Sequence, residues 1–184
     1  MLETPLTILD MPYDADIVVY PDGRNVTTSE AVAVASDSTD IATVEKVLIA
    51  DINARAQDAS FIITSFNNGS FAGSVIPGCD SCLNTTHVGY FGHSVGGCAG
   101  ATLMLNDTRV AGAINFDGAV FGDVVEQGLD RPFMLMATTG QTREGSLANI
   151  TNWATLWSNL RGPSFDLILN DAKHYTCKHQ EPLS

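Results

Sequence analysis

Positive charge is scarce in this sequence. Its 184 residues contain 9 Lys and Arg against 21 Asp and Glu, a formal net charge of −12. That balance argues against nucleic acid or an anionic membrane as an electrostatic partner. Long apolar runs are also missing, since none approaches the roughly 18–20 residues that span a bilayer. Hydrophobic residues still make up 45% of the chain and charged residues 16%. We therefore expect a single folded domain over residues 1–184.

The first residues, Met-Leu-Glu-Thr-Pro, have neither the basic nor the apolar segment of a signal peptide. Another feature nevertheless indicates an extracellular protein. Five of the eleven asparagines begin an Asn-x-Ser/Thr sequon, where chance predicts about two. These are Asn25, Asn68, Asn84, Asn106 and Asn149. We expect a secreted glycoprotein.

The four cysteines, Cys79, Cys82, Cys98 and Cys177, allow up to two disulfides in three pairings. Cys79 and Cys82 form a C-x-x-C in a loop before a strand, whereas a thioredoxin-like redox motif would open a helix. Zinc would need a second pair of ligands, which is not obvious here. We expect a structural disulfide, with free thiols as the alternative and no metal or cofactor.

Short apolar strands alternate with amphipathic helices, a pattern typical of a mostly parallel α/β sheet with flanking helices. The expected strands are Leu6–Asp10, Ile17–Tyr20, Val88–Phe91, Val110–Phe116, Phe133–Ala137 and Phe165–Leu169. The expected helices are Thr43–Ala56, Gly96–Leu105 and Ser146–Leu160, the last with core tryptophans. Between them, Phe66–Cys82 is rich in Asn, Gly and Ser and is expected to be a loop.

The motif Gly92-His93-Ser94-Val95-Gly96 lies between an expected strand and an expected helix. A G-x-S-x-G in this context is a nucleophile elbow, a sharp turn that points the serine hydroxyl out of the sheet. The glycines are expected to keep the turn free of clashes. Ser94 is the candidate nucleophile, and the Val95 N–H at the helix start is a candidate oxyanion donor.

A serine nucleophile needs a histidine base, which follows it in the chain of this fold. Only His174 and His179 lie downstream of Ser94. His174 is favoured because it comes a few residues after the last strand, whereas His179 lies further into the tail. Upstream, His93 is part of the elbow and His87 is expected to be an ordinary surface residue.

The acid partner is located by elimination. Many α/β-hydrolases carry it after the strand that is Phe133–Ala137 here, but no carboxylate follows that strand before Glu144. The preceding strand runs directly into Asp117, which is therefore favoured over Asp123 and Asp171.

Three segments resemble the platelet-activating-factor acetylhydrolase family of α/β-hydrolases. They are Gly-His-Ser-Val-Gly-Gly from Gly92, the run from Asp107 to Gly118, and the run from Leu129 to Met136. Near the start, Met11–Ala15 and Tyr20–Arg24 resemble the same family. The resemblance implies calcium-independent hydrolysis of a short sn-2 acyl ester of a phospholipid, releasing acetate from 1-alkyl-2-acetylglycerophosphocholine. It makes Ser94 the nucleophile, Asp117 the acid and His174 the base, and it implies transient contact with a lipid surface.

Members of that family have three further strands before the one at Leu6–Asp10, and a His-Gly-type loop among them supplies a second oxyanion N–H. Neither is found in this sequence. The strand with that loop lies, in the family, between the Leu6–Asp10 strand and the elbow strand. We therefore expect a strand-wide gap at the centre of the sheet, and an N-terminally incomplete form that folds poorly or hydrolyses short-chain esters slowly.

Two other functions remain open. One is a secreted carboxylesterase or polyester hydrolase that shares the elbow but not the phospholipid preference. The other is a catalytically weak, pseudoenzyme-like binding domain, which only the missing oxyanion loop favours. The sequence does not indicate an oligomeric state.

Overall fold

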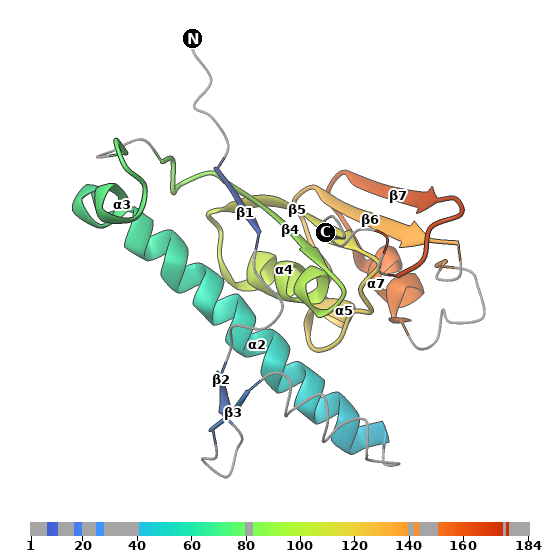
Figure 1. The fold of residues 1–184 in the computed structure, drawn as a ribbon. Helices are drawn as coiled ribbons and strands as arrows, with labels where there is room; N and C mark the ends of the chain where they lie inside the picture. The colour runs from blue at the N-terminus through green and yellow to red at the C-terminus, as the bar shows by residue number, and fades with distance from the viewer. Residues whose placement is uncertain are drawn as a thin grey trace, which may run out of the picture.

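The computed structural model describes residues 7–10, 17–19, 25–27, 41–79, 83–139, 142–143, 151–174 and 176. Within them lies a five-stranded sheet of order β1-β4-β5-β6-β7, in which every neighbouring pair is parallel (Figure 1). Its strands are β1 (Thr7–Asp10), β4 (Val88–His93), β5 (Val110–Phe116), β6 (Phe133–Thr138) and β7 (Ser164–Leu169). A separate hairpin pairs β2 (Ile17–Val19) with β3 (Asn25–Thr27) in antiparallel fashion. The predicted mostly parallel α/β architecture is confirmed.

Strand β1 pairs directly with the elbow strand β4. Thr7 lies opposite Val88, and the register continues without a break to Asp10 opposite Phe91. The predicted gap between these two strands is therefore wrong. In a parallel sheet the backbone groups of one strand bond to the next, so β1 satisfies the edge of β4 that an empty position would leave unpaired.

The described helices lie on one face of the sheet. The strands from β4 to β7 follow each other in one direction, so right-handed crossovers place α4 (Val95–Asn106), α5 (Val124–Gln127) and α7 (Trp153–Asn159) on the same side. The long helix α2 (Ile41–Phe66) packs across α4, as Figure 1 shows. Strand burial alternates accordingly: Ala113 and Asn115 of β5 are buried under α4, and Ile114 is only half-buried.

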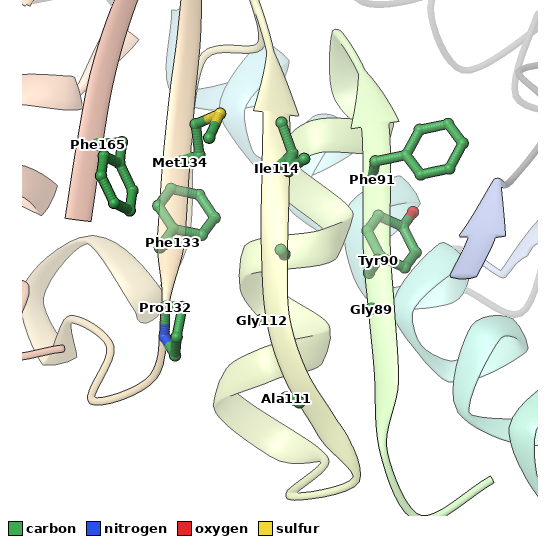
Figure 2. A pocket seen from close by; sticks show the side chains of 11 residues that line it. Gly89, Tyr90, Phe91, Ala111, Gly112, Ile114, Pro132, Phe133, Met134 and Phe165 are labelled. Carbon is green, nitrogen blue, oxygen red and sulfur yellow. The ribbon is translucent and has the colours of Figure 1, made fainter. Parts of the chain in front are cut away.

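The opposite face of the sheet is apolar and open. Phe91, Ile114, Met134 and Phe165 project from four neighbouring strands into a hollow of about 350 Å³ (Figure 2). Parallel sheets are normally covered on both faces. None of the helices in the described part of the chain covers this one, and Phe165 is 55% exposed.

The structure corrects one loop prediction and two helix predictions. The stretch predicted as a loop contains a helix, α3 (Gly69–Val75), because the side chain of Asn68 accepts hydrogen bonds from the N–H groups of Ser70 and Phe71. Helix α2 also runs ten residues beyond the predicted end at Ala56. In the helix predicted over Ser146–Leu160, residues 146–150 lie outside the described part, and Asn152 is left-handed at φ 56°. Among the described residues of this stretch, Trp153–Asn159 forms the continuous helix α7.

The cysteines fall into two groups. Cys79 is disulfide-bonded, as predicted for a structural disulfide, and Cys98 is a free, buried thiol. Cys82 and Cys177 lie outside the described residues. Of the sequon asparagines, Asn68 and Asn106 are exposed and Asn84 is half-buried; their glycosylation stays a prediction.

None of the helices among the described residues has the length and apolar character needed to cross a membrane.

A polar cluster ties α2 to the turn between α4 and β5. Asp107, which is 8% exposed, accepts hydrogen bonds from the guanidinium of Arg109: Nη2 lies 2.6 Å from Oδ2, and Nε lies 2.9 Å from Oδ1 and 3.2 Å from Oδ2. The hydroxyl of Ser60 on α2 donates to the same carboxylate at 2.8 Å. The hydrogen bonds from Arg109 lower the pKa of Asp107 from 3.8 to about 2.

This depressed pKa predicts how the cluster loses its stabilising effect in acid. The contribution of Asp107 is present above its unfolded pKa near 3.8 and is lost as the pH falls toward about 2. Asp107→Asn should lower the free energy of unfolding by on the order of 2 kcal/mol near neutral pH. Urea unfolding between about pH 6 and pH 2 should show this difference shrinking in acid. Asp130→Asn is the control, since its side chain is 71% exposed. A difference that stays constant to pH 2 would contradict the prediction.

Candidate active site

Ser94 occupies a strained turn between β4 and α4. Its backbone has φ 57° and ψ −125°, a conformation that residues with a side chain rarely adopt. The Ser94 N–H donates to the carbonyl of Phe116 on β5 at 2.9 Å, and the Ser94 carbonyl accepts from the N–H of Gly97 at 2.9 Å. The turn is thus held by the neighbouring strand and by the helix that it starts, as a nucleophile elbow requires.

Of the two motif glycines that were expected to avoid clashes, only Gly92 is sterically required. A Cβ at Gly92 would collide with the backbone of Gly96, so this motif glycine is required. At Gly96 a Cβ would meet nothing within 4 Å, and the prediction that this glycine avoids a clash is wrong. The second close approach is at Gly97, where a Cβ would collide with the side chain of Asn115.

Asp117 follows β5 in a second left-handed turn, at φ 58°. Its N–H donates to the carbonyl oxygen of Met136 on β6 at 2.9 Å. The buried side chain of Asn115 spans this turn: its Nδ2 donates to the carbonyl of Gly118, and its Oδ1 accepts from the Gly118 N–H, both at 2.8 Å. Trp153 Nε1 also donates to the Gly118 carbonyl, at 2.6 Å. These bonds hold the acid turn beside the elbow.

The carboxylate of Asp117 is 1% exposed and accepts hydrogen bonds from three groups. The N–H of Thr138 donates to Oδ1 at 2.7 Å, and the Thr138 hydroxyl donates to Oδ2 at 3.0 Å. The third group is the imidazole of His174, whose Nδ1 lies 2.8 Å from Oδ2. Because a carboxylate only accepts, this contact places a proton on Nδ1. The other ring nitrogen, Nε2, then faces Ser94 as an acceptor.

His174 links Ser94 to Asp117, so the three predicted residues form one chain of hydrogen bonds. Its Nε2 lies 3.1 Å from the hydroxyl oxygen of Ser94, which fits a bond donated by the hydroxyl. The structure thus brings Ser94, Asp117 and His174 together. The alternative acids Asp123 and Asp171 are exposed, at the start of α5 and after β7. Glu144 and His179 lie outside the described residues.

Val95 begins α4, so its N–H is among the first four of the helix, which have no acceptor within it. It stands next to Ser94, as the oxyanion prediction requires, and its role stays a prediction. The nearby thiol of Cys98 is unsuited to chemistry, because burial raises its pKa to about 12. Among the described residues, no three His, Cys, Asp or Glu side chains form a group that could hold a metal ion.

Sequence analysis missed the residues that support the site. Asn115 and Thr138 bond to the acid turn, and Trp153 was assigned only to the core. Asn115 carried one usable signal, because a polar residue at an inward position of an apolar strand needs buried partners. His93, expected only as part of the elbow, also contacts the main chain of His174.

The parallel sheet, the strained serine turn and the order Ser94, Asp117, His174 along the chain define an α/β-hydrolase fold. Over 157 residues, 81% of the chain, the sequence is 30% identical to a probable 1-alkyl-2-acetylglycerophosphocholine esterase of Arthroderma benhamiae. The match confirms the resemblance to the platelet-activating-factor acetylhydrolase family. It covers 33% of that protein, so the chain spans about a third of the length of the curated relative it matches.

A solved structure gives the same fold. The ferulic acid esterase of Streptomyces cinnamoneus superposes with a TM-score of 0.59 at 27% identity, over 87% of this chain and 41% of that one. No protein-family profile matches the chain.

The close approach of the two turns generates a steric prediction. A Cβ at Gly118 would collide with the carbonyl oxygen of Ser94 and lie 2.8 Å from Asn115 Oδ1. Gly118→Ala should therefore force the turns apart and lower the free energy of unfolding by about 2 kcal/mol or more, measured by urea unfolding. Gly96→Ala is the matched control, since its Cβ meets nothing within 4 Å. Equal stability of the two variants would show that the turns are not in contact.

Proposed function

We propose that the protein is a serine esterase that cleaves carboxylic esters through a covalent acyl-enzyme on Ser94. The observation that carries the proposal is the position of His174, whose two ring nitrogens face the Ser94 hydroxyl at 3.1 Å and the buried Asp117 carboxylate at 2.8 Å. A serine hydroxyl is a weak nucleophile unless a base accepts its proton, and this geometry provides that base.

In the first half of the reaction, Ser94 Oγ attacks the ester carbonyl while its proton moves to His174 Nε2. The imidazolium that forms is stabilised by Asp117, whose other hydrogen bonds come from Thr138. The developing oxyanion is placed to accept from the Val95 N–H at the positive end of α4. Collapse of the intermediate breaks the bond to the alcohol oxygen, which takes the proton from Nε2 and leaves the acyl group on Ser94.

In the second half, a water molecule attacks the acyl carbonyl and gives its proton to the same Nε2. Collapse of this intermediate releases the carboxylic acid, and the proton returns to Ser94 Oγ. Asp117 holds Nδ1 protonated throughout, so Nε2 is always the nitrogen that faces the reaction. The cycle needs no cofactor or metal.

For the substrate, we propose the short sn-2 acyl ester of a phospholipid. The support is the named relative of Arthroderma benhamiae and the family motifs around Ser94 and Asp117. The competing substrate class is a general carboxylic ester, which the similarity to a ferulic acid esterase favours. Hydrolysis of either substrate class would use the same three residues. The two classes differ in the acyl and alcohol groups that the site must accommodate.

The roles of the three residues predict a pattern of labelling by a fluorophosphonate, which reacts with activated serines. Ser94→Ala should abolish labelling, because the attacking oxygen is gone. Asp117→Asn and His174→Ala should slow labelling and ester hydrolysis by about 10³-fold or more, because the base loses its tautomer or is absent. The rates are measured by labelling over time and with p-nitrophenyl acetate.

Two controls test whether the losses are specific. Asp171→Asn changes an exposed carboxylate in a left-handed turn that asparagine also adopts, and His87→Ala changes an exposed imidazole. Both should label like the unchanged protein. Labelling that persists in Ser94→Ala would reject the proposed nucleophile.

The substrate proposal predicts a preference between two phospholipids that differ only in the sn-2 chain. The kcat/KM for 1-alkyl-2-acetylglycerophosphocholine should exceed that for the analogue with a long sn-2 acyl chain by at least about 10-fold. A feruloyl ester serves as the third substrate. Faster hydrolysis of the feruloyl ester than of the acetyl phospholipid would favour the general carboxylesterase instead.

A further inference from the structure

His93 contacts the proposed base without taking part in the chain of proton transfers. It is the last residue of β4 and directly precedes Ser94. Its Nε2 lies 2.6 Å from the main-chain oxygen of His174, and the two imidazole rings are in contact, with centroids 4.6 Å apart and planes tilted by 42°. Both side chains are half-buried. His93 on the elbow strand thus contacts both the main chain and the ring of His174.

The direction of this hydrogen bond follows from its atoms. A carbonyl oxygen only accepts, so Nε2 of His93 carries the proton and donates it. A neutral imidazole satisfies this requirement. The donor belongs to β4, which is paired on one side with β1 and on the other with β5. His93 is therefore anchored in the sheet.

The acceptor, in contrast, belongs to a loop. His174 follows β7 after a left-handed residue, Asp171, and Lys173 beside it is exposed. The loop is tied to Thr139, the residue that follows β6, by the bond from the Asp171 N–H to Thr139 Oγ1, at 3.1 Å. Within the loop, the Thr176 N–H donates to the Lys173 carbonyl at 2.8 Å and forms a turn around His174. The bond from His93 adds a tie between residue 174 itself and the strand that bears Ser94.

A base that bridges two atoms tolerates little displacement. The His174 ring spans 2.8 Å to Asp117 and 3.1 Å to Ser94, and a shift of its main chain lengthens one contact or the other. Misplacement of a reacting group by about 1 Å can cost about 10²-fold in rate. The hydrogen bond from the His93 side chain to the main chain of His174 is suited to prevent such a shift.

We propose that His93 is a positioning residue that holds the main chain of His174 in register with the elbow; the proposal rests on the function proposed above, because it acts on the same base. The donated hydrogen bond is the essential part. The contact between the two rings supports this hydrogen bond but does not replace it.

Two substitutions separate the hydrogen bond from the ring. His93→Phe keeps a flat ring against His174 and removes the donor, whereas His93→Gln removes the ring and keeps an N–H of similar reach. His93→Phe should lower kcat for p-nitrophenyl acetate by about 10- to 100-fold, with KM within about twofold and an unfolding temperature close to that of the unchanged protein. His93→Gln should recover most of kcat. His87→Phe, at the exposed histidine, is the control.

A second measurement does not depend on turnover. The proton on His174 Nδ1, bonded to Asp117, should give a downfield proton NMR signal in the unchanged protein and in His93→Gln, and the signal should broaden or vanish in His93→Phe. If the unchanged protein neither labels at Ser94 nor hydrolyses esters, the proposed function fails while this signal still tests His93. Equal kcat and equal signals in both variants would overturn the proposal. So would equal losses in both variants that parallel a fall in unfolding temperature.

Discussion

The pair of hydrogen bonds between the Asn115 side chain and the main chain of Gly118 is the contact on which the site geometry depends. It closes a turn around Asp117, which has a left-handed backbone conformation, and the bonds from Asp117 N–H to Met136 and from Trp153 to Gly118 support the same turn. Gly118 then sits so close to the Ser94 carbonyl that no side chain fits between them. The same Asn115 side chain leaves room only for glycine at position 97. One buried amide therefore sets the distance between the acid turn and the elbow.

The parts of this arrangement that local sequence determines were predictable. Strand β5 has the predicted bounds, Val110–Phe116, because its apolar run is flanked by a polar turn and by Asp117. The elbow was predictable because its glycines and its strand-to-helix context are adjacent in the chain. Chain order and position after a strand then indicated Asp117 and His174, which the structure brings into contact.

Helix α3 was missed although its signal is local: the Asn68 side chain caps it through Ser70 and Phe71, in a stretch whose composition is that of a loop. The other misses depend on contacts between distant residues, which no local pattern encodes. The pairing of β1 with β4 joins residues some eighty positions apart, and composition says nothing about which strand fills that place. The contact of His93 with His174 also spans the chain, so an elbow histidine looked like part of the motif alone.

The carboxylate proposed as the acid follows β5 rather than β6 in this chain. In this chain β6 ends at Thr138 rather than at a carboxylate, and the N–H and hydroxyl of Thr138 both bond to Asp117, which comes from the end of β5. Because β5 and β6 are neighbouring parallel strands, their carboxyl ends meet at the same edge of the sheet. The Asp117 carboxylate after β5 thus reaches His174, while the end of β6 supplies two of its hydrogen-bond donors. Thr138, the last residue of β6, therefore complements the Asp117 carboxylate that follows β5.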